Sequence, residues 1–304
     1  NDEGGWFNRA VNGLYPPGST FKIVTSCAAL RAGAIAPAEQ LTCNGFHQVG
    51  TRLFACHDRH AHGQVDLRKA LALSCNVYYY QLGLETGVDG LAEEARRFHL
   101  DRPTGIELNE TRRMNVPDPA WKKKTGAGGW NPGDTANMSI GQGALIFSPL
   151  QMACFIASFA RGESLTVPTI LHLPGRSPSG RFPRVPLGLA AADYQAVVDG
   201  LERVIGIGTG KLARVEGVRV AGKTGTAQIR KDGQNLNVAW FVCFAPVERP
   251  EIAIAIALEG GEPDVEYGGG RHGAPVARAI MQEYFAKKER RPAAGPVFRI
   301  SPQP

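Results

Sequence analysis

Tyr15-Pro-Pro-Gly-Ser19-Thr-Phe-Lys22 stands where an irregular segment passes into a long apolar run. Two prolines and a glycine interrupt regular structure before Ser19, so the pattern predicts a loop that leads into a helix over residues 19–32. Gly33 follows at a position where a left-handed helix cap is favoured. Residues three apart share one face of a helix, so this spacing places the Lys22 amine within reach of the Ser19 hydroxyl.

A serine and a lysine in this arrangement suit nucleophilic catalysis. Burial among apolar neighbours lowers the pKa of a lysine and makes the neutral amine available to take the serine proton. The helix N-terminus adds backbone N–H groups at the place where an oxyanion would form. Alone, however, Ser-x-x-Lys is a weak signal, because the pattern recurs by chance on exposed helices.

Two further stretches strengthen the catalytic interpretation. Ser74-Cys75-Asn76 follows an apolar run, and Lys223-Thr-Gly-Thr226 follows another. A Ser-x-x-Lys, a Ser-x-Asn and a Lys-Thr-Gly in this order are typical of penicillin-binding proteins and serine β-lactamases. Each has a structural alternative: Ser74 and Asn76 could cap a helix, and Lys223–Thr226 could be an edge strand. Their joint occurrence favours a catalytic site.

The chain resembles class B penicillin-binding proteins, the peptidoglycan DD-transpeptidases, and most of all the elongation-type penicillin-binding protein 2 group. This resemblance extends over nearly the whole chain. It is carried by the short motifs Asn8-Arg9-Ala10, Leu14 to Lys22, His62-Gly63, Ser74 to Asn76, Trp121-Lys122-Lys123, Pro132-Gly133-Asp134, Ile140-Gly141-Gln142-Gly143, Ser148-Pro149-Leu150-Gln151-Met152-Ala153, Lys223 to Thr226 and Ala274-Pro275-Val276.

The resemblance implies a role for each motif residue. Ser19 would be the nucleophile and Lys22 its proton acceptor, while Ser74 bridges the proton path toward the leaving amine. Asn76 would donate a hydrogen bond to the substrate amide. Lys223 would supply positive charge that lowers the pKa of Lys22 and attracts a carboxylate.

The substrate would lie along the Lys-Thr-Gly-Thr motif. The resemblance implies that the hydroxyls of Thr224 and Thr226, on either side of Gly225, bind the substrate carboxylate. The backbone N–H groups of Ser19 and Thr226 would form the oxyanion hole, a kind of contact whose loss slows a reaction roughly 100- to 1000-fold.

The predicted fold class is α/β of the α+β kind, with an antiparallel sheet flanked by helices and an all-helical subdomain, as in penicillin-binding proteins and serine β-lactamases. Alternation of apolar residues predicts strands over 218–230, 238–245 and 251–258. In the family, the first sheet strands precede the nucleophile motif, and here they are missing. One sheet edge should therefore be open or covered differently, and Pro296 to Ile300 could occupy it.

Other segments give weaker signals. Helices are expected over 66–73, 77–84, 90–98, 149–160, 190–205 and 275–285. Residues 37–63 show no periodicity and are expected to be an irregular insertion. The long glycine-rich loop 103–143 ends at Gly141-Gln142-Gly143, which either lets backbone approach a ligand or forms a tight turn. The transpeptidase domain is predicted to cover 1–286, followed by a mobile, charged, proline-rich tail over 287–304.

Composition limits the function. The chain has 304 residues, 43% of them hydrophobic and 20% charged, which is ordinary for a globular protein. Its formal charge of +6 is scattered, so nucleic acid is not an expected partner. No stretch approaches the roughly 20 apolar residues of a membrane span. The family's membrane anchor and pedestal domain are absent, so we expect a fragment or processed form from the periplasmic side of the inner membrane.

Four residues suggest a structural zinc site. Cys43, Cys56, His62 and Cys75 are three thiols and one imidazole, a set that closes a tetrahedral zinc site. Some elongation-type relatives have acidic residues where Cys43 and Cys56 stand. A disulfide between Cys43 and Cys56 is the alternative, and Asp58, His57 or His60 could replace His62. Cys27, Cys154 and Cys243 lie in apolar segments and need no role.

The expected partners follow from the family resemblance. They are peptidoglycan stem peptides, β-lactams and, for the full-length protein, a membrane-embedded glycosyltransferase; no organic cofactor is expected. Alternative functions share the acyl-enzyme step: a serine β-lactamase, a D-Ala-D-Ala carboxypeptidase, or a β-lactam-sensing receptor domain. Asn76 in place of valine disfavours a class D β-lactamase, and the class A Glu-x-x-Leu-Asn element is absent.

Overall fold

The computed structural model describes residues 7–57, 59–171, 184–231, 233–261 and 267–290. At its centre lies a three-stranded antiparallel sheet in the order β5-β6-β7. The strands are β5 (Ala221–Lys231), β6 (Gln234–Ala245) and β7 (Ile252–Glu259). The predicted strands are thus confirmed, with bounds that differ by a few residues.

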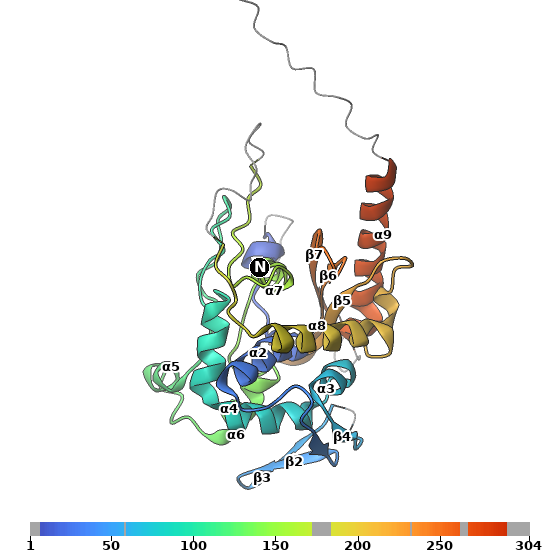
Figure 1. Ribbon diagram of the computed structural model, residues 1–304. Helices are drawn as coiled ribbons and strands as arrows, with labels where there is room; N and C mark the ends of the chain where they lie inside the picture. Colours follow the sequence, from blue (N-terminus) through green and yellow to red (C-terminus); the bar gives the residue numbers. More distant parts are fainter. Residues whose placement is uncertain (1–6, 58, 172–183, 232, 262–266, 291–304) are drawn as a thin grey trace, which may run out of the picture.

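The middle strand β6 presents hydrophobic side chains to both faces of the sheet, and helices cover both faces. Alternate residues enter two hydrophobic clusters: Val238, Trp240, Val242 and Phe244 enter one, and Phe241, Cys243 and Ala245 enter the other. The first cluster includes α2 (Lys22–Ala32) and α7 (Pro149–Ala160), and the second includes α9 (Ala274–Arg290). Helix α8 (Ala191–Gly206) contributes to both (Figure 1). Since side chains alternate along a strand, a strand buried on both faces is apolar throughout.

A helical region lies beside the sheet. Helix α2 packs on α4 (Asn76–Arg97), and α4 packs on α6 (Pro132–Ser139), with the short α5 (Pro119–Lys124) nearby (Figure 1). Helix α3 (Leu67–Leu73) packs against α8. The two helices predicted over 77–84 and 90–98 are the halves of α4, which kinks at Gly87, where φ is 77°. The predicted all-helical subdomain is confirmed.

The segment 37–63 was predicted to be irregular, but it contains two small antiparallel ladders. Strand β1 (Leu41–Cys43) pairs with β4 (Gly63–Val65), and β2 (Phe46–Val49) pairs with β3 (Arg52–Ala55), both antiparallel. Each strand has only three or four residues and mixed burial. Such runs are too short to show the alternation that identifies a strand, which explains the wrong prediction.

Two segments contain more helix than the sequence predicted. Helix α9 continues to Arg290, so the predicted domain border after residue 286 falls inside a helix. The loop 103–143 contains α5 and α6. Residues 296–300 lie outside the described residues; within these, no strand pairs with the outer edge of β5 or β7. None of the described helices is both long and apolar enough to span a membrane.

Candidate active site

Ser19 stands on a short 3-10 turn, η1 (Gly18–Phe21), rather than on the first turn of the predicted helix. Gly18 has φ 53°, and a Cβ at this position would lie 2.6 Å from the carbonyl oxygen of Thr226. Its N–H donates to the carbonyl of Gly141 at 2.9 Å. Only glycine fits this left-handed, crowded position, so Gly18 fixes Ser19 beside strand β5.

Gly141 supports the same turn, in agreement with the tight-turn interpretation, while the ligand-approach interpretation stays a prediction. A Cβ on Gly141 would lie 2.0 Å from the carbonyl oxygen of Gly18, so the two backbones touch. The next residue, Gln142, donates from Nε2 to the carbonyl of Thr226 at 3.3 Å. The loop therefore holds the nucleophile turn against β5, and Gln142 is the residue that faces the open side.

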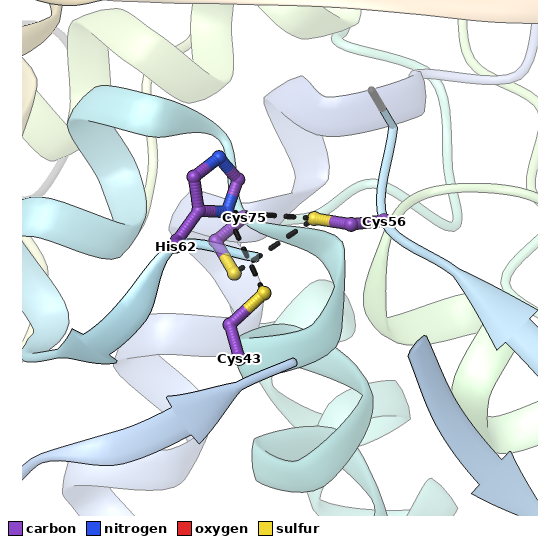
Figure 2. Close-up of side chains that lie close together, drawn as sticks. All are labelled: Cys43, Cys56, His62 and Cys75. Atoms are coloured by element: carbon purple, nitrogen blue, oxygen red, sulfur yellow. Dashed lines mark hydrogen bonds between the residues drawn. The ribbon is translucent and has the colours of Figure 1, made fainter. Parts of the chain in front are cut away.

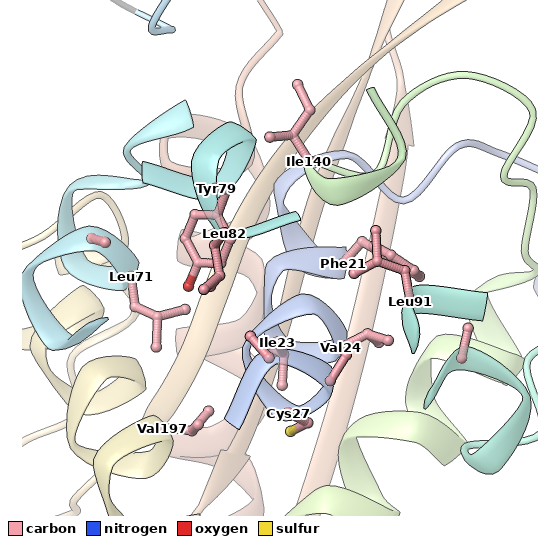
Figure 3. Packing of buried hydrophobic residues seen from close by; sticks show 14 of the residues in the cluster. Phe21, Ile23, Val24, Cys27, Leu71, Tyr79, Leu82, Leu91, Ile140 and Val197 are labelled. Carbon is pink, nitrogen blue, oxygen red and sulfur yellow. The ribbon is translucent and has the colours of Figure 1, made fainter. Parts of the chain in front are cut away.

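Lys22 is fully buried, as predicted, at the start of α2. Its apolar surroundings include Phe21, Ile23, Val24 and Cys27, whose packing Figure 3 shows. Burial is the largest effect on this lysine and lowers its pKa to about 7, while negative charge on Cys75 and Cys56 acts in the opposite direction. A substantial fraction of Lys22 is therefore a neutral amine near neutral pH.

The hydrogen bonds of Lys22 go to the second motif. Nζ donates to the carbonyl of Ser74 at 2.7 Å, to Ser74 Oγ at 3.2 Å and to Asn76 Oδ1 at 2.6 Å. Among the described residues, no hydrogen bond joins Nζ to Ser19, so the predicted direct contact is not made in this state. Contacts in a catalytic site often tighten only when substrate binds, so Lys22 keeps its place as the candidate base.

The second motif forms the junction between two helices, as predicted. Ser74 ends α3 in the left-handed conformation, with φ 53°, and its N–H donates to the carbonyls of Ala70 and Leu71. Cys75 then opens α4, where its Sγ accepts from the N–H of Tyr78 at 3.4 Å. A non-glycine residue with positive φ is uncommon and holds a fixed position. The junction therefore sets the orientation of Ser74 and Asn76.

Lys223 does not lie in the open cleft as expected. It is fully buried, and Nζ donates to Ser74 Oγ at 2.9 Å and to the carbonyl of Thr224 at 3.1 Å. Burial and the charge of Lys22 hold its pKa well below the usual range. Burial is thus the largest cause of the lowered pKa of both lysines.

The predicted motif residues meet at one cavity of about 570 Å³. Six of the eight predicted catalytic and substrate-binding residues line it: Ser19, Ser74, Asn76, Thr224, Gly225 and Thr226. The other two, Lys22 and Lys223, are buried and reach Ser74 from within the protein. Burial on one side and an open cavity on the other are what a serine nucleophile with a desolvated base requires.

Four of the residues that line the cavity carry no sequence motif: Thr209, Lys211, Leu212 and Arg271. His57 and Gln142 line it as well, although the sequence suggested His57 only as a possible metal ligand. Thr209 Oγ1 lies 2.5 Å from Thr224 Oγ1, so it orients a predicted substrate-binding hydroxyl. The available signal was glycine: Gly208 and Gly210 flank Thr209, and Gly268 to Gly270 precede Arg271. Glycine clusters mark close backbone approach but do not say to what.

Cys43, Cys56, His62 and Cys75 converge behind the second motif (Figure 2). Their ligand atoms all lie within 4.8 Å of one another. His62 Nδ1 is 3.6 Å from both Cys43 Sγ and Cys56 Sγ, and the sulfurs of Cys56 and Cys75 are 3.9 Å apart. All six cysteines are free thiols. Asp58 lies outside the described residues, and His57 lines the cavity while its ring centroid stays 6.1 Å from that of His62.

The three shortest of these separations match the edges of a tetrahedral metal site. With Zn–S bonds of about 2.3 Å and Zn–N bonds of about 2.1 Å, the edges of a tetrahedron are about 3.8 Å between sulfurs and about 3.6 Å between sulfur and nitrogen. Three of the four donors are almost completely buried. Soft, buried thiolates with one imidazole are a donor set suited to zinc rather than to magnesium or calcium.

Comparison with protein families gives one match over residues 1–282, to the penicillin binding protein transpeptidase domain. The chain is 32% identical over 308 residues to the peptidoglycan D,D-transpeptidase MrdA of Acinetobacter baumannii, covering 94% of this chain and 44% of that protein. It is 34% identical over 292 residues to PbpA of Mycobacterium tuberculosis, covering 90% and 56%. The chain spans about half the length of these curated relatives.

Solved structures give the same result. Pseudomonas aeruginosa PBP2 in complex with WCK 5153 matches with a TM-score of 0.81 and 31% identity, covering 91% of this chain and 62% of that one. The complex between PBP2 and MreC from Helicobacter pylori matches with a TM-score of 0.80 and 30% identity, covering 93% and 52%.

Proposed function

This chain belongs to the family of penicillin-binding protein transpeptidase domains, and we propose that it is a peptidoglycan DD-transpeptidase of the cell-elongation type, which cross-links stem peptides through an acyl-enzyme on Ser19. One observation carries this function. Three motifs from distant parts of the chain meet at a single cavity, beneath which the buried Lys22 hydrogen-bonds the second motif.

Acylation begins when Lys22, as the neutral amine, takes the proton of the Ser19 hydroxyl. Ser19 Oγ forms a bond to the carbonyl carbon of the penultimate D-alanine, and the peptide bond to the terminal D-alanine breaks. The proton passes through Ser74, which touches both Lys22 and Lys223, to the leaving amine. An acceptor amine then attacks the ester and returns a proton along the same path, which restores Ser19.

Backbone N–H groups of Ser19 and Thr226 serve as the oxyanion hole in this proposal. The close approach of Gly18, the neighbour of Ser19, to Thr226 supports this assignment: a Cβ on Gly18 would lie 3.3 Å from the Thr226 nitrogen. Preorganised donors aimed at the developing oxyanion are commonly the largest single contribution to such a reaction. The hydroxyls of Thr224 and Thr226, which line the same cavity, bind the substrate carboxylate.

The alternatives differ in the fate of the acyl-enzyme. A serine β-lactamase or a carboxypeptidase must activate water, for which class A β-lactamases use a glutamate. Among the described residues that line the cavity, none is aspartate or glutamate. This lining supports a transpeptidase, which protects the ester until an amine arrives. A β-lactam-sensing receptor would acylate and stop there.

We further propose that Cys43, Cys56, His62 and Cys75 hold a structural zinc ion. The separations of the donor atoms and the burial of the thiols support it. When bound, zinc would supply a rigid cross-link among four chain segments. Cys75 lies between Ser74 and Asn76, so this cross-link would hold the second motif in place from behind.

The whole protein is proposed to act on the periplasmic side of the inner membrane, beside a membrane-embedded glycosyltransferase. Support comes from neighbours: one matched structure is a complex of PBP2 with MreC, and another concerns coordinated polymerization and crosslinking by a peptidoglycan synthase complex. Within this chain, the catalytic domain is proposed to extend to the end of α9 at Arg290.

The function is tested by intact mass spectrometry after incubation with a penicillin. We expect a persistent adduct on Ser19 that the Ser19→Ala variant does not form, because this change removes only a hydroxyl. Ser26→Ala is the matched control and should label normally. Ser26 lies on the neighbouring helix α2, and its hydroxyl hydrogen-bonds that of Tyr79. Labelling of Ser19→Ala, or rapid return of the wild type to its unmodified mass, would contradict a transpeptidase with this nucleophile.

A further inference from the structure

The charge that recognises a carboxylate in this cavity has to come from outside the Lys-Thr-Gly motif. Lys223 is buried, both of its hydrogen bonds go to protein atoms, and its pKa lies well below the usual range. The hydroxyls of Thr224 and Thr226 can donate hydrogen bonds but carry no charge. An ionised ligand group at these hydroxyls needs cations that reach the cavity surface.

Two exposed cations line the cavity, Lys211 and Arg271. They lie on two short helical turns that pack against each other, η3 (Lys211–Ala213) and η4 (Gly269–Gly273). In sequence the two residues are far apart. Both turns thus bring a positive charge to the same side of the cavity.

That side is where Thr224 lies. Thr209, two residues before Lys211, has its Oγ1 2.5 Å from Thr224 Oγ1. A Cβ built on Gly270, next to Arg271, would lie 3.5 Å from Cγ2 of Thr224. Thr209 therefore contacts, and Gly270 lies close to, the threonine that is proposed to bind a carboxylate.

The residues that the structure describes leave both cations without a neutralising carboxylate. In the described part of the chain, Lys211 and Arg271 take part in no ion pair, and no carboxylate lines the cavity. Other arginines are paired, as Arg219 is with Glu202 and Glu248. A cavity lined by charges of one sign concentrates the field and attracts ligands of the opposite sign.

We propose that Lys211 and Arg271 bind the C-terminal carboxylate of the donor peptide beside Thr224 and Thr226, and so select donors that end in a free carboxylate. This inference rests on the proposed transpeptidase function and names the residues that recognise its substrate. The terminal carboxylate belongs to the leaving residue, so it lies a few bonds from the carbonyl that Ser19 attacks. The planar guanidinium of Arg271 can bind it with two parallel hydrogen bonds, and Lys211 adds a point charge.

The test compares two thioester donors that differ only in the leaving group, which ends in a free carboxylate or in the matching carboxamide. Second-order rate constants for acylation of Ser19 are measured for the wild type, Lys211→Gln, Arg271→Gln and the double variant. Lys124→Gln on α5, which contributes no residue to the cavity, is the control for loss of charge. For the carboxylate donor we expect a loss of about tenfold in each single variant, as for a charged hydrogen bond.

The carboxamide donor should react within about twofold of the wild-type rate in every variant, and added salt should slow only the carboxylate donor. An equal loss for both donors would mean that the cations merely support the cavity, and unchanged rates would mean that they do not touch the substrate; either result overturns the inference. A wild-type protein that neither donor nor penicillin acylates would instead overturn the proposed function, and this inference with it.

Discussion

Two buried lysines donate to the hydroxyl of Ser74, Lys22 at 3.2 Å and Lys223 at 2.9 Å. A second ammonium so close to the first is unfavourable, which explains why the charge of Lys22 lowers the pKa of Lys223. Ser74 is therefore more than a neighbour of the nucleophile. It connects the two amines, so a proton can pass between the base and the side of the leaving group.

The pKa of Lys22, about 7, gives a prediction for the pH dependence of acylation. Below this value Lys22 is protonated and cannot accept the Ser19 proton, so the acylation rate constant should rise through pH 7 and level off above it. Lys22→Ala should lower the rate roughly 100- to 10,000-fold. Stopped-flow acylation by a chromogenic cephalosporin measures both quantities.

The inflection itself distinguishes a base from a structural residue. Lys22→Ala should abolish the inflection near pH 7, whereas Lys124→Ala, an exposed lysine on α5, should keep the wild-type profile. A rate that does not change between pH 6 and pH 8, or an inflection that survives in Lys22→Ala, would place the base elsewhere.

At the scale of elements, the junction of α3 and α4 lies where residues beside β1, β3 and β4 converge on the start of α4. Cys75 both opens α4 and belongs to the cluster of four donors. Cys43 ends β1, Cys56 follows β3, and His62 precedes β4, so the two small ladders deliver the other donors. These ladders bury little apolar surface of their own, and a metal would compensate by linking them to α4.

The zinc proposal predicts about one zinc per chain in protein purified without added metal. Cys75→Ser should lose the zinc and most β-lactam reactivity, because the junction carrying Ser74 and Asn76 is no longer held. Cys154→Ser, a cysteine of α7 outside the cluster, should keep both. Elemental analysis and penicillin labelling are the measurements. Metal-free, fully reactive protein with a Cys43–Cys56 disulfide would end the idea.

Elements with strong local signals could be predicted from the sequence. Asp66 and Ser148 cap α3 and α7, and Gly33 ends α2 in the left-handed conformation with φ 67°, as expected for Gly33. The four donors were identified from their spacing, their residue types and the family resemblance, and the structure brings them together. The elements that were missed, β1 to β4 and η1, are short and owe their form to tertiary contacts rather than to a local pattern.

At the scale of the whole molecule, the sheet and its two helical layers bring distant segments to one cavity. The burial of Lys22 could be predicted from its apolar neighbours in the sequence, but the burial of Lys223 could not. Lys223 was expected in the cavity and is buried, because β5 turns it toward Ser74. Lys211 and Arg271 carry no motif, and only the packing of η3 against η4 places them together. Such placements depend on tertiary geometry that no local pattern encodes.

The most direct test of the central claim is the partition of the Ser19 acyl-enzyme between an amine and water. A thioester donor is supplied with increasing concentrations of a D-amino acid acceptor, and the aminolysis and hydrolysis products are quantified by liquid chromatography with mass detection. A transpeptidase should form the aminolysis product in excess, in proportion to acceptor, and Ser19→Ala should form neither. Hydrolysis that dominates at every acceptor concentration would contradict the account and indicate a carboxypeptidase.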